Sequence, residues 1–241
     1  VKRYRITSFA GILVMPVWAI LDLHHFPAGS QNVYSTAFDA QERPVDAPFR
    51  PDPLSRAAAA AAANGRTDLS IAIAGSGGSG VMTAGTMLLD AAARAGLYGL
   101  MVRTSGPQIR GGEAAALLRL GRSPLESLDD HFDLLLAIDW QNVHRFADEI
   151  PLRDGSLVVG EADGGEIPAV FLAGGARPVA LPLKKMVKAI PGSWINMVAL
   201  GLSGALAGLP LQALEAAVRQ GWKRGAAAHD ANLQALHAGM A

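Results

Sequence analysis

The sequence predicts an α/β fold: a doubly wound, mostly parallel sheet followed by a C-terminal helical segment. Short apolar runs alternate with stretches of helical length from residue 68 onward, a glycine-rich turn joins the first run to the first helix, and helical patterns close the chain. Of the 241 residues, 50% are hydrophobic and 17% are charged, which is typical of a folded domain with a sizeable core.

The first elements lie on either side of a glycine cluster. We expect a strand at Leu69–Ala74 and a helix rich in Ala, Met and Leu at Val81–Ala95, which Gly96 ends. Further strands are expected at Leu100–Arg103 and Leu134–Ile138. The last of these is fully apolar, which favours a position buried inside a parallel sheet.

The alternation continues and then gives way to helices. The amphipathic segment Gln141–Ile150 indicates a helix. Ser193 is a candidate N-cap for the first C-terminal helix, and Pro210 is placed to open the second. The remaining expected elements are the strands Ser156–Val159 and Pro178–Leu181 and the helices Trp194–Ala207, Leu211–Arg224 and His229–Ala238.

Residues 1–67 differ from the rest of the chain. Basic residues precede an apolar run over Ile6–Leu21, as they do in a secretory signal or anchor. Gly11 and Pro16 interrupt this run, which is short for a membrane span. We therefore expect a poorly structured or artefactual extension over 1–67, one domain over 68–241, a cytoplasmic location and no membrane partner.

Charge and cysteine content exclude several functional classes. The 21 basic and 21 acidic side chains cancel, so no overall field draws the chain to nucleic acid. With 0 cysteines, the chain cannot hold a disulfide, a thiolate zinc site or an iron–sulfur cluster. The adjacent pair His24 and His25 projects in different directions, so we expect no metal site there.

The glycine cluster lies between a strand and a helix, the usual context of a phosphate site. Glycines let the backbone approach an anion, and the helix N-terminus offers free N–H groups and a positive dipole end. The alternative is a tight turn without a ligand. The candidate residues are Gly75, Ser76, Gly77, Gly78, Ser79 and Gly80.

The end of the next strand discriminates between phosphate ligands. An NAD site requires an acidic residue about 20 positions further on, where it binds the ribose hydroxyls. Here the strand ends in Arg103-Thr104-Ser105. A cation at this position suits a ribose phosphate, as in NADP or in the 3′-phospho-ADP portion of CoA.

A second cluster runs from Ser105 to Glu113. Arg110 precedes Gly111 and Gly112, so a guanidinium lies beside an open backbone and could clamp an anion. The alternative is a surface loop in which Arg110 pairs with Glu113 or with a partner chain.

In their order and spacing, these segments resemble the gamma domain of 2-oxoacid:ferredoxin oxidoreductases. The resemblance extends from Asp68 to the C-terminus. Ser79 stands where many relatives have Gln, which leaves its role open. The matching segments are Gly75–Gly85, Ala95–Gly99, Ser105–Ala115, Phe132–Ala137, Asn196–Gly201 and Asn232–Gly239.

The resemblance implies a CoA-contacting subunit or domain that is not active alone. The complex would oxidatively decarboxylate a 2-oxoacid to acyl-CoA and pass the electrons to ferredoxin. Thiamine diphosphate, Mg²⁺ and 4Fe–4S clusters would lie on alpha- and beta-type thiamine-binding subunits and on a ferredoxin-type iron–sulfur partner. An NADP-binding oxidoreductase domain and a non-catalytic scaffold subunit are the alternatives.

The resemblance also implies which residues face CoA. These are Ser76–Gly80 together with Ser105, Arg110, Gly111 and Gly112. Gly75 and Arg103 complete the candidate cofactor-binding set. No catalytic residue and no metal ligand is assigned to this chain.

Overall fold

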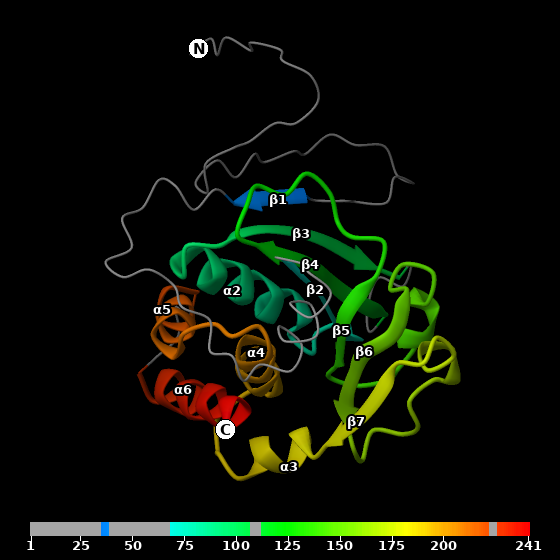
Figure 1. Ribbon diagram of the computed structural model, residues 1–241. Helices are drawn as coiled ribbons and strands as arrows, with labels where there is room; N and C mark the ends of the chain where they lie inside the picture. Colours follow the sequence, from blue (N-terminus) through cyan, green and yellow to red (C-terminus); the bar gives the residue numbers. More distant parts are fainter. Residues whose placement is uncertain (1–34, 39–67, 107–111, 222–225) are drawn as a thin grey trace, which may run out of the picture.

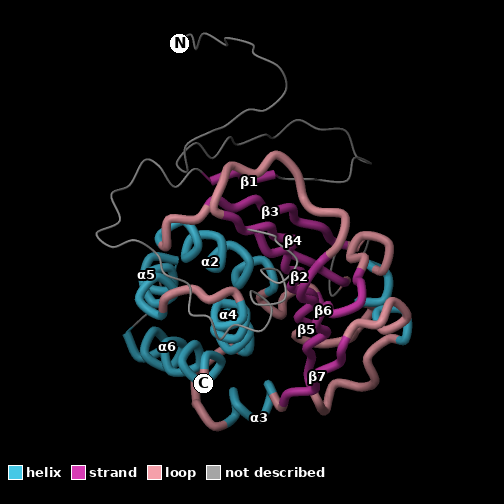
Figure 2. The backbone as a smooth tube through the Cα atoms, viewed as in Figure 1, coloured by secondary structure: helices cyan, strands magenta, loops and turns pink. Residues whose placement is uncertain are grey.

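A computed structural model describes residues 35–38, 68–106, 112–221 and 226–241 (Figure 1). Within these residues the chain forms a single seven-stranded sheet with helices packed against it. The strands, coloured magenta in Figure 2, are β1 (Ser35–Phe38), β2 (Asp68–Ser76), β3 (Tyr98–Ser105), β4 (Glu113–Gly121), β5 (Phe132–Ala137), β6 (Leu152–Glu161) and β7 (Arg177–Leu181).

The strand order is β1-β3-β4-β2-β5-β6-β7. Strands β2, β5, β6 and β7 are mutually parallel, and β4 is antiparallel to both of its neighbours, β2 and β3. Since β3 therefore runs in the same direction as β2, only β1 and β4 oppose the others. The expected α/β class and the mostly parallel sheet are confirmed.

Two hydrophobic clusters cover the two faces of the sheet. The larger one joins β2, β5 and β6 to the helices, which gather on one side in Figure 1. The smaller one lies on the opposite face and is closed by Trp140, Phe146 and Phe171. The helices are α2 (Val81–Arg94), α3 (Leu183–Lys188), α4 (Ile195–Leu206), α5 (Leu211–Gly221) and α6 (Ala226–Met240), with 3-10 turns η2 (Val143–Phe146) and η3 (Ala169–Phe171).

Most of the expected elements form within a few residues of their expected bounds. The C-terminal helical segment is confirmed as α4, α5 and α6. Residues 222–224, the end of the expected helix Leu211–Arg224, lie outside the described residues. In the described part of the chain, no helix is long and apolar enough to cross a membrane.

The helix expected at Gln141–Ile150 is wrong. Only the short 3-10 turn η2 forms there. Asn142 precedes it with a φ of 59°, a left-handed conformation that interrupts a regular helix. Val143 and Phe146 are buried, so their helical spacing reflects packing in a turn.

The cap expected at Ser193 is also wrong. The N-cap of α4 is Trp194, and the Ser193 hydroxyl instead donates to the Val187 carbonyl at 3.4 Å. The Trp194 backbone N–H donates to Asn232 Oδ1 at 3.1 Å, so α6 contributes the polar side chain at this end of α4.

Candidate functional site

The glycine cluster lies at the point where the strand order reverses. The chain leaves β2 for β3 and β4 on one side and then crosses to β5 on the other. In α/β sheets, ligands bind outside the carboxyl ends of the strands at such a switch point. Ser76 ends β2 at this edge, Asp139 follows β5 and Gly112 precedes β4, so three separate segments meet here.

Two glycines in the loop require a left-handed backbone. Gly78 has a φ of 95° and Gly80 a φ of 90°, where side chains other than hydrogen are strained. Gly80 is also crowded, because a Cβ there would lie 2.5 Å from Asn196 Nδ2. The loop therefore turns sharply from β2 into α2 only with glycine at these positions.

Asp139 holds the end of β2 in place. Its Oδ2 accepts the Ser76 backbone N–H at 3.0 Å and the Ser76 hydroxyl at 2.8 Å, and its Oδ1 accepts the Gln141 N–H at 3.1 Å. Sequence reasoning did not select Asp139. It could have been selected from the sequence, because it directly follows the expected apolar strand Leu134–Ile138. Binding-site residues of α/β proteins commonly lie at this carboxyl end of a strand.

Much of the loop's own hydrogen-bonding capacity is used internally. Ser79 donates its backbone N–H at 3.1 Å and its hydroxyl at 2.6 Å to the Ser76 carbonyl. Gly77 N–H donates to the Gly112 carbonyl at 2.5 Å, which joins the two sequence clusters. The backbone N–H groups of Gly78 and Gly80 have no such partner among the described residues.

The N-terminus of α2 has no side-chain cap. Within α2, the first backbone N–H that has a backbone acceptor is that of Ala84, which donates to the Gly80 carbonyl at 2.9 Å. The preceding N–H groups of an α-helix have no intrahelical acceptor, and they carry the positive end of the helix dipole. This end can therefore receive an anionic oxygen.

Asn196 connects α4 to this loop. The side chain is 5% exposed, and its Nδ2 donates to the Gly80 carbonyl at 3.3 Å. Asn232 on α6 accepts the Trp194 N–H at the start of α4. The two asparagines of the matching C-terminal segments thus link α6 to α4 and α4 to the glycine loop.

Arg103 lies along α2. Its Nη2 donates to Thr86 Oγ1 at 3.1 Å, and its Nε is buried without a partner among the described residues. Ser105, two residues further along β3, is exposed at the carboxyl edge. Arg110 and Gly111 lie outside the described residues.

Glu113 and Arg145 form an ion pair that sequence reasoning missed. The Glu113 side chain is 2% exposed, and Arg145 Nη1 lies 3.3 Å from its Oε2. A Cβ at Gly106 would overlap the Glu113 carboxylate, and the Gly106 N–H donates to the Glu113 carbonyl at 2.9 Å. The residues on both sides of 107–111 are therefore held together, and Glu113 already has a cationic partner.

The fold and this site define an α/β domain with a glycine-rich strand–loop–helix at the switch point of its sheet. The sequence model of one family, pyruvate ferredoxin/flavodoxin oxidoreductase, matches residues 70–241. The chain belongs to this family. No curated protein matches it.

The solved structures that are similar to the chain include three oxidoreductase structures. A 2-oxoglutarate:ferredoxin oxidoreductase from Magnetococcus marinus, with 2-oxoglutarate, coenzyme A and succinyl-CoA bound, has a TM-score of 0.63 and 28% identity. The match covers 72% of this chain and 30% of that one, so this chain spans less than a third of its length.

The other two structures show the shared fold. The gamma subunit of a keto/oxoacid ferredoxin oxidoreductase from Geobacter sulfurreducens PCA has a TM-score of 0.58 and 24% identity, over 72% of this chain and 94% of that one. The pyruvate oxidoreductase subunit PORC from Thermotoga maritima has a TM-score of 0.59 and 21% identity, over 73% and 96%.

Proposed function

We propose that this chain is the CoA-contacting gamma-type subunit or domain of a 2-oxoacid:ferredoxin oxidoreductase. Family membership and the similarity to subunits of such enzymes support the subunit role. The relative with 28% identity was solved with CoA and succinyl-CoA bound, which supports CoA as the ligand. The iron–sulfur clusters would belong to partner subunits, because this chain has 0 cysteines, and thiamine diphosphate would be held by the alpha- and beta-type subunits.

The observation that carries the proposal is the uncapped N-terminus of α2 at the switch point. The N–H groups of Gly78 and Gly80 and of the first helical turn would receive phosphate oxygens of CoA. Asp139 would act indirectly, because its bonds to Ser76 fix the end of β2 from which the loop starts. Ser76 and Ser79 would then fix the loop conformation through the hydrogen bonds that Ser79 donates to the Ser76 carbonyl.

The cations of the candidate set would complete the site. Arg103 and Arg110 suit the phosphates of the 3′-phospho-ADP portion, and Gly111 and Gly112 would leave the backbone open beside Arg110. Ser105 is exposed at the same edge and would offer a hydroxyl. In this arrangement the chain binds and orients CoA, while bond cleavage in the 2-oxoacid occurs on the partner subunits.

The test is steady-state kinetics of the reconstituted complex with CoA and the 2-oxoacid varied separately. Arg110→Ala removes a charge-assisted hydrogen bond of about 1.5–3 kcal/mol, which raises the KM for CoA by roughly ten- to a hundredfold. The KM for the 2-oxoacid stays unchanged, because the partner subunits form that pocket. Arg110→Lys recovers only part of the loss, since an ammonium cannot form the bidentate contact.

Arg122→Ala is the matched control, because Arg122 is exposed on the turn after β4. The control variant keeps the KM for CoA of the original chain. Activity from the chain without partners would contradict the subunit role. Binding of NADPH with no binding of CoA would favour the alternative NADP-binding domain.

A further inference from the structure

Strand β7 is more exposed to solvent than is usual for a strand of a parallel sheet. It is the last strand of the sheet and pairs only with β6. Residues 177–180 are exposed, and only Leu181 is half-buried. Strands of parallel sheets are normally covered on both faces, and native proteins protect free edges against unwanted pairing.

The exposure includes the face on which the helices pack. Val179 is paired in register with Val159, which belongs to the larger hydrophobic cluster. Paired residues point to the same side of a sheet, so Val179 lies on the helical face. The residue is nevertheless 37% exposed. Val170, on the turn η3 before β7, is 50% exposed.

The charged side chains on β7 and α3 themselves are all cationic, although Glu161 of the neighbouring strand β6 accepts the Lys184 backbone N–H at 2.6 Å. From Ile167 to Leu214 the sequence contains no Asp or Glu, although the chain as a whole has no net charge. The cations of this stretch are Arg177 on β7 and Lys184, Lys185 and Lys188 on α3. All four are exposed, and none forms an ion pair with another described residue.

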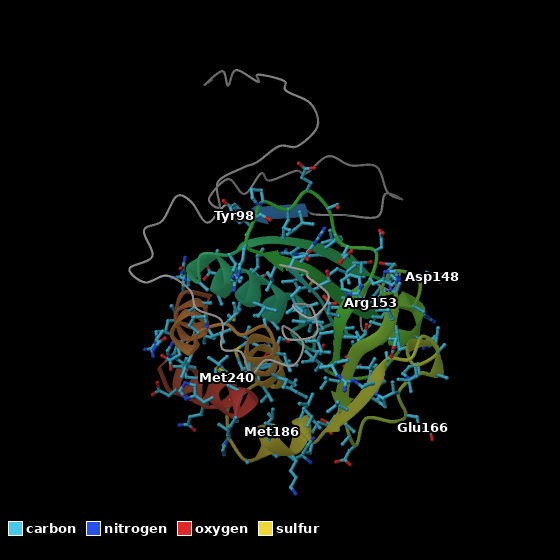
Figure 3. The ribbon with its side chains drawn as sticks, viewed as in Figure 1. Tyr98, Asp148, Arg153, Glu166, Met186 and Met240 are labelled. Carbon is cyan, nitrogen blue, oxygen red and sulfur yellow. The ribbon has the colours of Figure 1, made fainter. Side chains whose placement is uncertain are left out.

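Strand β7 and helix α3 lie next to each other in sequence and in Figure 1. In Figure 3, the label of Met186 marks α3, and that of Glu166 marks the connection that follows β6. We use the name β7–α3 face for the exposed residues of β7 and α3. These are Arg177–Ala180, Lys184, Lys185 and Lys188. The β7–α3 face combines an unpaired strand edge, an exposed valine and unpaired cations.

We propose that the β7–α3 face docks an acidic surface of a different polypeptide, which covers Val179 and neutralises the lysines. The inference rests on the proposed function, which places the chain beside thiamine-binding subunits, and it assigns one of these as the occupant. A second copy of this chain fits poorly, because a symmetric contact brings the same cations together and like charges across an interface are unfavourable.

The test compares the original chain with the triple variant Lys184→Glu, Lys185→Glu and Lys188→Glu. Binding of the purified chain to the purified thiamine-binding subunits is measured by surface plasmon resonance at low and high ionic strength. The dissociation constant of the variant rises by about tenfold or more. Association of the original chain slows with added salt, and this salt dependence is lost or reversed in the variant.

The matched control is the pair of single variants Lys185→Glu and Arg122→Glu. Both make the same charge change at an exposed site, but Arg122 follows β4, which lies on the far side of β2 from β7 in the strand order. Only Lys185→Glu weakens binding. Because the altered side chains are exposed, circular dichroism and the melting temperature of each variant stay close to those of the original chain. Hydrogen exchange gives a second readout, in which the β7 amides that face away from β6 become protected when the subunits bind.

Several outcomes would overturn the docking proposal. If the triple variant binds as well as the original chain, the β7–α3 face is not the docking site, while the proposed function stands. If the original chain does not bind the subunits at all, both proposals fail. Slow exchange, in the isolated chain, of the β7 amides that face away from β6 would show that the chain covers its own edge. A homodimer dissolved by the triple variant would show that a second copy is the occupant.

Discussion

At the scale of single residues, Gly80 meets two separate constraints. Its φ of 90° is strained for any residue with a Cβ, and a Cβ would lie 2.5 Å from Nδ2 and 2.6 Å from Cγ of Asn196. Gly78 meets only the first constraint, since its φ is 95° and no atom lies within 4 Å of the Cβ position. Alanine substitutions at Gly78 and Gly80 can therefore separate the cost of backbone strain from the cost of steric overlap.

We expect Gly80→Ala to lower the free energy of unfolding by more than Gly78→Ala. Strain alone costs about 1–3 kcal/mol at either site, and Gly80→Ala adds the overlap with Asn196. In a double-mutant cycle, Asn196→Ala relieves part of that overlap, with a coupling energy of about 0.5–3 kcal/mol. Urea denaturation measures all of these values. Equal losses at Gly78 and Gly80 would show that Asn196 does not confine the loop.

The candidate site could be predicted only in part from the sequence. The glycine loop is a local pattern, so strand, turn and helix were read correctly around Gly75–Gly80. The residues that fix the loop are distant from it in the chain. Asp139 is 63 positions from Ser76, and Asn196 is 116 positions from Gly80. Their roles follow from the strand order, which no local pattern specifies.

At the scale of elements, α4 and α6 approach each other at two glycines. A Cβ at Gly201 would lie 2.1 Å from the Leu236 carbonyl oxygen, and a Cβ at Gly239 would lie 2.1 Å from that of Val198. Both contacts are with backbone, which cannot move aside as a flexible side chain can. The glycines of the two C-terminal segments therefore set the distance between these helices.

We expect Gly201→Ala to destabilise the protein strongly, although alanine favours helices. Overpacking against a neighbouring backbone costs about 1–3 kcal/mol or more, which exceeds the gain in helix propensity of about 1 kcal/mol. Thermal unfolding followed by circular dichroism measures the effect.

Gly221→Ala is the control for this substitution. A Cβ at Gly221, the last residue of α5, would approach the flexible Met87 Cε at 2.7 Å. Because that methyl group can move, the variant should keep or slightly raise the melting temperature. Equal stability of Gly201→Ala and Gly221→Ala would contradict the close approach of α4 and α6.

Element prediction failed where burial hid the usual periodicity. No strand was predicted at Glu113–Gly121, where β4 forms, and Ala114–Ala116 carries no alternation of apolar and polar residues. The strand lies between β3 and β2 and is buried along nearly its whole length, so both of its faces are apolar. Conversely, the helical spacing after Trp140 arises from the buried turn η2.

At the scale of the whole molecule, both hydrophobic clusters are built from residues between Leu69 and Leu236. Strand β1 adds to this domain at the edge of the sheet, where Ser35–Phe38 pairs with residues 99–102 of β3. The proposed domain 68–241 thus contains the described core, and β1 is an addition to one edge.

We expect a chain that begins at Asp68 to fold cooperatively. Of the interactions between described residues it loses the backbone hydrogen bonds between β1 and β3, so we expect the free energy of unfolding to fall by about 1–3 kcal/mol. A chain that begins at Tyr34 retains β1 and serves as the comparison in denaturant titrations. Loss of the cooperative transition on removal of residues 1–67, with the transition kept on removal of residues 1–33, would show that β1 is essential to the domain.

The position of β4 has a consequence for the order in which the chain can fold. Strands β2 and β3 run in the same direction but do not touch, because β4 lies between them and pairs with both. A nascent chain that ends before residue 113 thus has two strands separated by a vacant position. The β3–β4 hairpin is local in sequence and closes early, whereas its pairing with β2 spans a longer loop and closes later. Since Gly77 meets Gly112 only in that second step, the two glycine clusters come together when the hairpin docks.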